Sequence, residues 1–252
     1  MIRVFSALLF LSCALYTSIL FSATDKNPTP TEVITEMESR MRSSSMQGNL
    51  VMKIETPHWK RSLSVAFWIL GSEKACVKIS APPKEAGIAS LRIGENMWNY
   101  FPKVERTVKI PVSLMMQPWM GSDFTNDDIM RATSFVKDYT HSLQSLQGTD
   151  ESRVWEIVSL PKRGVPVLWG KVVTRVGADY LPQKQEFFST RGVLVKVLTY
   201  SDIQMIGGRR YPRIWKMESK DKNSSSTTIT YRDILFDVSI PQEIFSLRNL
   251  GR

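Results

Sequence analysis

The chain has 252 residues, a formal net charge of +9 and two cysteines. Cys13 lies in an N-terminal apolar run, so Cys76 is the one cysteine of the remaining sequence, which excludes an internal disulfide and a cysteine-ligated metal site there. The sequence has no histidine spacing typical of a metal site and no glycine-rich phosphate-binding loop. We therefore expect no metal and no cofactor, and the positive charge favours anionic partners such as acidic lipid headgroups.

Residues 1–23 have the pattern of a secretory signal peptide. Arg3 precedes an uncharged run from Val4 to Phe21, and the small residues Ser22 and Ala23 follow it. At about 18 residues, the run also has the length of an uncleaved inner-membrane anchor. Because the next residues are polar and include prolines, we expect cleavage, which predicts a periplasmic protein with residues 24–252 as a single domain.

An amphipathic helix is predicted over residues 31–42. Val33, Ile34, Met37 and Met41 recur at helical spacing, and Thr31 follows a proline where an N-cap is expected. The apolar stripe should pack against the rest of the protein.

From Gly48 onward the sequence changes to short strands separated by turn residues. The predicted strands are GNLVMKIET, RSLSVAFWIL, EKACVKIS, GIASLRI and NMWNYF. Trp98 and Tyr100 share one face of the last of these, and Pro102 should end it because proline cannot donate to a ladder. Val104–Ile110 is expected to form a further strand with a cationic rim.

A connector without regular structure is predicted between Pro111 and Pro118. Thr125 then has the character of an N-cap, with Asp127 and Asp128 in the first turn, where the helix dipole favours negative charge. The apolar stripe predicts a single helix from Asn126 to about Thr140. The carboxylates of Asp123, Asp127 and Asp128 resemble a catalytic cluster, but helix capping also explains them.

The second half returns to strands: SRVWEIVSLP, LWGKVVTRVG, LPQKQEFFS, VLVKVLTYSDI, RRYPRIWKMES and TTITYRDILFD. No helices alternate with strands, so the sheet should be antiparallel, and so many strands should curl rather than lie flat. The prediction is a mainly β protein with helices (α+β), with about 11 strands in one sheet.

The order of these segments resembles the LolA-like family of outer-membrane lipoprotein-sorting proteins. The most specific segments are GSDF before the central helix and GGRRYP before a strand, although Gly121, Gly207 and Gly208 also fit simple turn geometry. The resemblance implies a single unclosed antiparallel β barrel, with an N-terminal helix and a central helical lid over an apolar concave face. It also implies that this face holds acyl chains in the periplasm.

Large apolar side chains in the strands and methionines in the connector are the candidates for that cavity and lid. Ordinary core packing uses the same residue types, and unbranched methionine side chains can adapt to ligands of variable shape. The candidates are Val65, Phe67, Trp68, Ile69, Trp98, Tyr100, Met115, Met116, Met120, Ile129 and Trp155.

Two groups of cations are candidates for contact with a lipid headgroup or a partner at the cavity mouth. The first is Lys103, Arg106 and Lys109, and the second contains Arg209 and Arg210. A solvated strand face would have the same composition, so both interpretations stay open.

No catalytic residue is predicted. His58 is expected in an exposed turn and His141 at an exposed helix end, and no GxSxG nucleophile motif is present. Secretion argues against a nucleic-acid partner.

The preferred hypothesis is a monomeric periplasmic carrier for the acyl chains of lipoproteins or lipids, with transient membrane contact and an inner-membrane transporter as partner. The second is a lipid-responsive sensor or adaptor that regulates a membrane protein. The third, a small-molecule enzyme on the same scaffold, would need a polar cavity with convergent acid, base and nucleophile groups.

Overall fold

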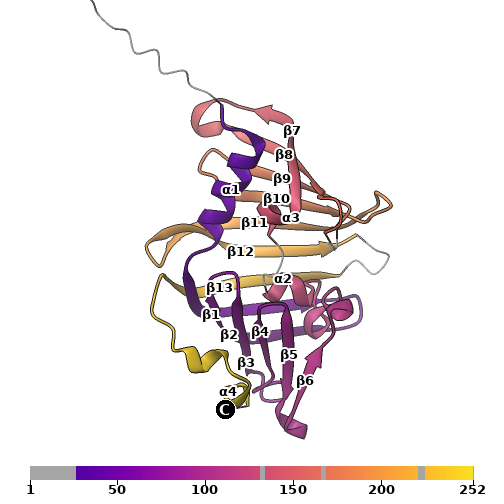
Figure 1. Ribbon diagram of the computed structural model, residues 1–252, viewed down its shortest axis with the longest axis vertical. Coiled ribbons are helices and arrows are strands. Elements are labelled where there is room, and N and C mark those ends of the chain that lie inside the picture. Colours follow the sequence, from indigo (N-terminus) through magenta and orange to yellow (C-terminus); the bar gives the residue numbers. More distant parts are fainter. Residues whose placement is uncertain (1–26, 131–133, 166–168, 221–224, 252) are drawn as a thin grey trace, which may run out of the picture.

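Thirteen antiparallel strands form one continuous sheet (Figure 1). The computed structural model describes residues 27–130, 134–165, 169–220 and 225–251, so the predicted signal peptide lies outside the described residues. The strands are β1 Ser45–Glu55, β2 Lys60–Leu70, β3 Lys74–Ala81, β4 Ala89–Ile93, β5 Asn96–Phe101, β6 Arg106–Ile110, β7 Tyr139–Gln147, β8 Val154–Pro161, β9 Lys171–Gly177, β10 Pro182–Phe188, β11 Leu194–Ile206, β12 Arg209–Ser219 and β13 Ser226–Phe236. The helices are α1 Pro30–Met41, α2 Asn126–Met130, α3 Phe135–Asp138 and α4 Leu247–Leu250, with the 3-10 turns η1 Pro102–Val104, η2 Val112–Leu114, η3 Trp119–Gly121, η4 Asp150–Ser152 and η5 Gln242–Phe245.

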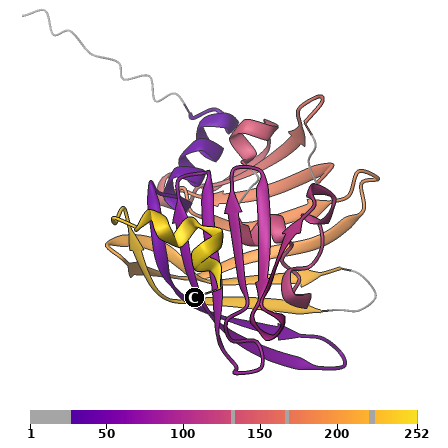
Figure 2. The same cartoon turned by 60° about the horizontal axis from the view of Figure 1, so that its bottom comes forward.

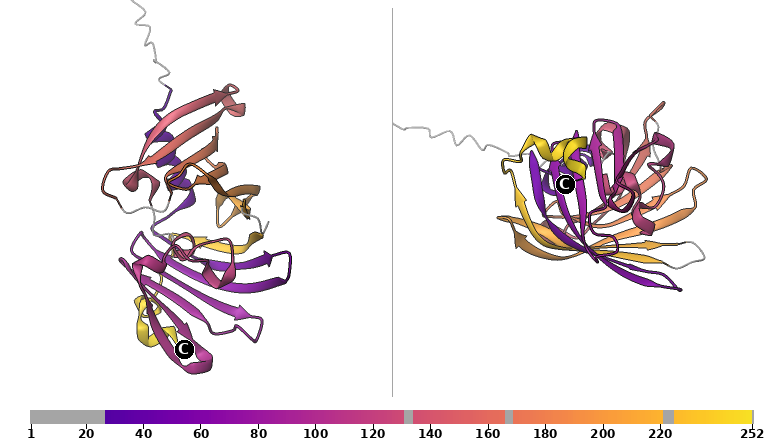
Figure 3. Two further views of the ribbon diagram at one scale, coloured as in Figure 1. Left: turned by 90° about the vertical axis from the view of Figure 1, so that its right-hand side faces the viewer. Right: turned by 90° about the horizontal axis from the view of Figure 1, so that it is seen from below.

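The sheet consists of two meanders, β1 to β6 and β7 to β13, joined where β1 pairs with β13. β6 and β7 are the two edges, and they do not pair with each other, so the curved sheet stays open (Figure 3). The prediction of an unclosed antiparallel sheet with helices is confirmed, with 13 strands instead of about 11.

The N-terminal helix is confirmed, but it begins earlier than predicted. Thr29, not Thr31, is the N-cap: its Oγ1 accepts a hydrogen bond from the Glu32 N–H at 3.2 Å, and the Glu32 side chain accepts one from the Thr29 N–H at 2.7 Å. Pro30 occupies the first helical position, where its missing N–H leaves no bond unmade. The predicted apolar stripe of α1 is buried.

The single helix predicted from Asn126 to Thr140 is wrong. The described residues contain two short helices, α2 and α3, and Tyr139 already begins β7, where it pairs with Pro161. Ser134 starts α3 by accepting a hydrogen bond from the Lys137 N–H on its side chain. The ladder with β8 therefore outweighs the helical spacing of the apolar residues.

The strand predicted over Val104–Ile110 is shorter than expected. Pro102 does end β5, but Val104 belongs to η1, and Glu105 has a φ of 48°, so β6 begins only at Arg106. The turn predictions hold at Gly121, Gly207 and Gly208, which all have positive φ.

Helical segments cover both faces of the sheet. The largest apolar core lies on the concave face, and α1 packs over β7 to β9 there with Val33, Ile34 and Met37. On the convex face, η5 and α4 cover β3 and β4 (Figure 2). No helix in the described part of the chain is long and apolar enough to cross a membrane.

Candidate functional site

The chain between β6 and β7 runs from one edge of the sheet to the other, and its described parts cover the concave face. We call residues 111–130 and 134–138 the lid; they contain η2, η3, α2 and α3. Trp119, Phe124 and Met130 of this segment are buried in the concave core. The predicted central lid is therefore confirmed, but as short helices and turns rather than as one helix.

Two cavities lie between the lid and the concave face. The larger, cavity 1, has a volume of about 120 Å³ and is lined by Met37, Glu38, Met41, Arg42, Phe124, Asp127, Asp128, Phe135, Trp169, Pro182, Gln185, Phe187, Leu198, Tyr200, Trp215 and Met217. Cavity 2, of about 50 Å³, is lined by Met46, Leu50, Met52, Val65, Phe67, Ile69, Val77, Trp119, Phe124, Asp128, Ile129, Trp215, Ile229 and Tyr231. Phe124, Asp128 and Trp215 line both, so these side chains lie between the cavities.

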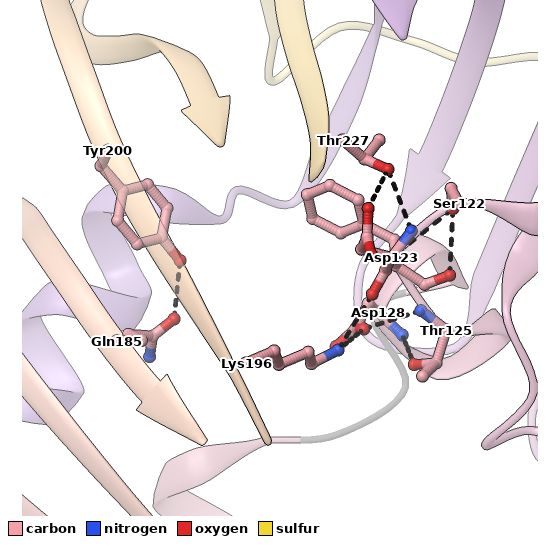
Figure 4. A network of polar contacts seen from close by, with 9 residues as sticks. Ser122, Asp123, Thr125, Asp128, Gln185, Lys196, Tyr200 and Thr227 are labelled. Carbon is pink, nitrogen blue, oxygen red and sulfur yellow. Dashed lines mark hydrogen bonds and ion pairs between the residues drawn. The ribbon is translucent and has the colours of Figure 1, made fainter. Parts of the chain in front are cut away.

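One buried ion pair fastens α2 to the sheet (Figure 4). The Lys196 ammonium of β11 lies 2.6 Å from Oδ2 of Asp128, and the two side chains are 5% and 18% exposed. The same ammonium lies over the rings of Trp169 and Phe187, at 4.9 and 5.3 Å from their centroids. The Asp128 carboxylate and the two rings together compensate for the hydration that the Lys196 ammonium loses when it is buried.

The start of α2 is fixed by local capping, as the sequence predicted. The Asp128 N–H donates to Oγ1 of Thr125 at 3.1 Å, and the Thr125 N–H donates to Oδ2 of Asp128 at 2.8 Å. The preceding Asp123 was also predicted to cap the helix, but its carboxylate instead accepts hydrogen bonds from the hydroxyls of Thr227, at 2.6 Å, and Ser225. Asp123 therefore ties the lid to β13 and the residue before it.

Three further contacts hold the lid. Arg92 of β4 donates from Nε to the carbonyl of Met130 at 3.2 Å, and burial lowers the pKa of this guanidinium. Trp119 donates from Nε1 to Oγ of Ser90 at 3.0 Å. Glu38 of α1 accepts from the Phe135 N–H at 2.5 Å, so α1 caps α3.

The structure brings only part of the predicted cavity set together. Val65, Phe67 and Ile69 alternate inward along β2 and line cavity 2 with Ile129. Met115 and Met120 pack against the concave core, and Met116 is half-buried beside them in the chain.

Four predicted cavity residues lie elsewhere. Trp68, Trp98 and Tyr100 pack on the convex face in the cluster covered by η5 and α4, because their neighbours along each strand point inward. Trp155 is buried under α1, where its ring stacks on Tyr180. Strand alternation was visible in the sequence, but which face is concave was not.

None of the five predicted headgroup cations lines either cavity. Lys103 is exposed in η1, and Arg106 and Lys109 are exposed on the edge strand β6. The other two form ion pairs within the protein, Arg209 with Asp237 and Arg210 with Asp179.

None of the predicted cavity residues lines cavity 1. Phe187, Tyr200 and Trp215 come from β10, β11 and β12, and the lysine that pairs with Asp128 was not singled out. A lysine between apolar residues in VLVKVL was the available signal, since a cation inside a buried strand needs a partner.

The histidines give no accessible catalytic pair. His58 is exposed, as predicted, but His141 lies half-buried in β7 rather than at a helix end, and burial lowers its pKa. Nδ1 of His141 is 2.9 Å from Oγ of Ser159, a residue that is 0% exposed, so this hydroxyl is out of reach of a substrate. Among the described residues, no three His, Cys, Asp or Glu side chains are grouped so that they could hold a metal.

Cys76 of β3 is buried. It is a free thiol on the convex face, and burial raises its pKa to about 11. A thiol that stays protonated at neutral pH is a poor nucleophile.

Comparison with known proteins shows which families and structures this chain resembles. A family model described as "-like: Uncharacterized protein" matches residues 71–252. Among curated proteins, none has a significant sequence match to this chain.

Solved structures share the fold over most of the chain. A LolA superfamily protein from Nitrosomonas europaea is 25% identical with a TM-score of 0.74, covering 88% of this chain and 99% of its own. A putative outer membrane lipoprotein-sorting protein domain from Vibrio parahaemolyticus is 19% identical with a TM-score of 0.77, covering 88% and 98%. A DUF1329 family protein from Desulfovibrio piger is 21% identical with a TM-score of 0.78, covering 88% and 100%.

Proposed function

We propose that this chain, which shares its fold with a LolA superfamily protein over most of its length, is a non-enzymatic periplasmic carrier that holds the acyl chains of lipoproteins or lipids and moves them toward the outer membrane. The observation that supports this most directly is the pair of cavities beneath the lid. Their walls are mainly aromatic, aliphatic and methionine side chains. Such walls favour an alkyl chain, which gains by leaving water and needs no fixed polar partner.

The carrier needs a cover that can move. Three methionines, Met115, Met116 and Met120, lie in the lid segment, and their flexible side chains suit apolar cargo of variable shape. The cavities are smaller than the acyl chains of a lipoprotein would require, so loading involves outward movement of the lid. The lid is fastened to the sheet by a limited set of polar contacts, chiefly those of Asp128, Asp123 and Arg92.

Cations in η1 and on the edge strand β6 supply the proposed contact with a membrane or partner. Lys103, Arg106 and Lys109 are exposed and therefore available to lipid phosphates or to an inner-membrane transporter that donates cargo. Arg209 and Arg210 would first have to exchange the carboxylates of Asp237 and Asp179 for a ligand.

The carrier proposal is tested by native mass spectrometry and lipid extraction of protein purified from the periplasm, followed by a donor-to-acceptor transfer assay. We expect a bound acyl ligand that passes to acceptor membranes. Repeated absence of ligand together with no transfer would reject the proposal.

Two matched variants test whether the ligand occupies cavity 1. Met217→Phe places a ring in cavity 1 and should reduce ligand occupancy, whereas Met205→Phe, at a side chain that is 68% exposed, should not. A stable complex with an inner-membrane protein, without transfer, would instead support the sensor or adaptor hypothesis.

A further inference from the structure

We propose that cavity 1 selects amphiphiles whose apolar chain ends in an ammonium group. This inference rests on the proposed function, since it names the headgroup of the cargo that the cavity would hold. It follows from the distribution of charge and aromatic rings around cavity 1.

The two sides of cavity 1 differ in chemistry. Its helical side carries three carboxylates, Glu38 from α1 and Asp127 and Asp128 from α2, and among the described residues that line it Arg42 is the one cation. Its sheet side presents the rings of Tyr200 and Trp215. An ammonium between these sides would meet carboxylates on one side and aromatic faces on the other, and both interactions favour a cation.

The protein already holds one alkylammonium in this way. The Lys196 side chain is a four-carbon chain ending in an ammonium, and it extends along the concave face until that group meets Asp128 at 2.6 Å. The rings beneath it, Trp169 and Phe187, are themselves part of the wall of cavity 1. The wall therefore stabilises a buried ammonium at one point, and Glu38, Asp127, Tyr200 and Trp215 line the rest of the same cavity.

Polar groups at the floor do not offset this preference. The hydroxyl of Tyr200 donates to Oε1 of Gln185 at 2.7 Å, and Nε2 of Gln185 donates to Oγ1 of Thr174 at 3.3 Å. These donors are engaged within the sheet. An acidic headgroup would meet the negative charges of Glu38 and Asp127 in a partly desolvated space, where like charges repel more strongly than in water.

The test compares three probes with the same eight-carbon chain: n-octylammonium, 1-octanol and octanoate. Binding to the purified protein is measured at pH 7 by isothermal titration calorimetry. We expect octylammonium to bind roughly tenfold more tightly than octanol, with octanoate the weakest, because carboxylates and aromatic rings both favour a desolvated cation. Equal affinities, or tightest binding of octanoate, would overturn the inference.

Two variants locate the effect. Asp127→Asn should reduce the preference for octylammonium over octanol by at least threefold, while Glu95→Gln, at an exposed turn residue outside the cavity, should leave it unchanged. An unchanged preference in Asp127→Asn would count against the proposal.

The probes also separate this inference from the proposed function. If none of the three binds in a saturable way, the cavity takes no such chain and the carrier proposal itself fails. If all three bind with equal affinity, the carrier proposal stands and only the headgroup preference is rejected.

Discussion

Lys196 of β11 and Asp128 of α2 form a buried ion pair that joins the floor of the candidate cavity to its lid. Both partners are mostly buried, and the carboxylate also accepts the Thr125 N–H. Removal of either charge leaves the other without its partner in a partly desolvated space.

We therefore expect Lys196→Met to lower the free energy of unfolding by about 2–4 kcal/mol. The double variant Lys196→Met/Asp128→Leu should recover part of this loss, because no charge is left unpaired. Urea unfolding of these two variants and of Asp128→Leu completes a double-mutant cycle with the wild-type protein. The exposed pair Lys60–Glu55 is the control, and Lys60→Met should leave the free energy of unfolding nearly unchanged, because water already solvates both charges.

The link between α1 and α3 depends on Glu38, which accepts hydrogen bonds from the Phe135 N–H at 2.5 Å and the Ser134 hydroxyl at 3.1 Å. Glu38→Ala should cost about 1–2 kcal/mol, as expected for a lost helix cap. Hydrogen exchange should accelerate in residues 134–138, while Glu36→Ala, which removes only an exposed pair with Arg40, should leave these amides protected. Equal exchange in both variants would contradict a capping role for Glu38.

His141 makes stability depend on pH. Burial lowers its pKa in the folded protein below its ordinary value, so the unfolded chain binds the proton more readily. The free energy of unfolding should therefore fall as the pH drops below about 6.5, and His141→Gln should remove this part of the decline. Urea titrations at several pH values between 7 and 5 measure the difference between the two proteins. Parallel pH profiles would show that His141 does not contribute.

The covering of the convex face can be followed through Cys76. Because burial raises the pKa of its thiol to about 11, iodoacetamide should label Cys76 slowly in the folded protein and rapidly in urea. Phe245→Ala removes a ring from the cluster over this cysteine and should cost about 3–4 kcal/mol and speed labelling. Mass spectrometry of the Cys76 peptide gives the rate, and Leu247→Ala, at a 46% exposed side chain, is the control.

The adjacent glycines of the β11–β12 turn should respond differently to substitution. Both have positive φ, but a Cβ on Gly207 would lie 2.4 Å from the carbonyl oxygen of Ile234, whereas a Cβ on Gly208 would meet nothing within 4 Å. Gly208→Ala should cost about 1 kcal/mol, from backbone strain alone. Gly207→Ala should cost clearly more because β13 must also shift, and thermal unfolding of both variants tests the difference.

Local pattern was enough to predict most of the fold. Alternation identified the strands, Pro102 the end of β5, Thr125 the start of α2, and the stripe of α1 its buried face. These features depend on side chains a few residues apart, which the sequence displays directly. β7 was missed because its first residues, including Tyr139, continue a helical spacing of apolar residues and were predicted as helix. The same residues also fit a strand, and pairing with β8 decides in favour of the strand.

By itself, the sequence determined the antiparallel class, the buried stripe of α1 and the free thiol of Cys76, because periodicity and composition fix these properties. Only the tertiary structure decided which face of each strand meets the lid. As a result, Phe67 lines a cavity while Trp68 lies on the opposite, convex face. It also decided that Lys196 meets Asp128, two residues that are distant in sequence. The physical reason is that sheet curvature and the path of the lid are collective results of all the strand pairings, which no short segment encodes.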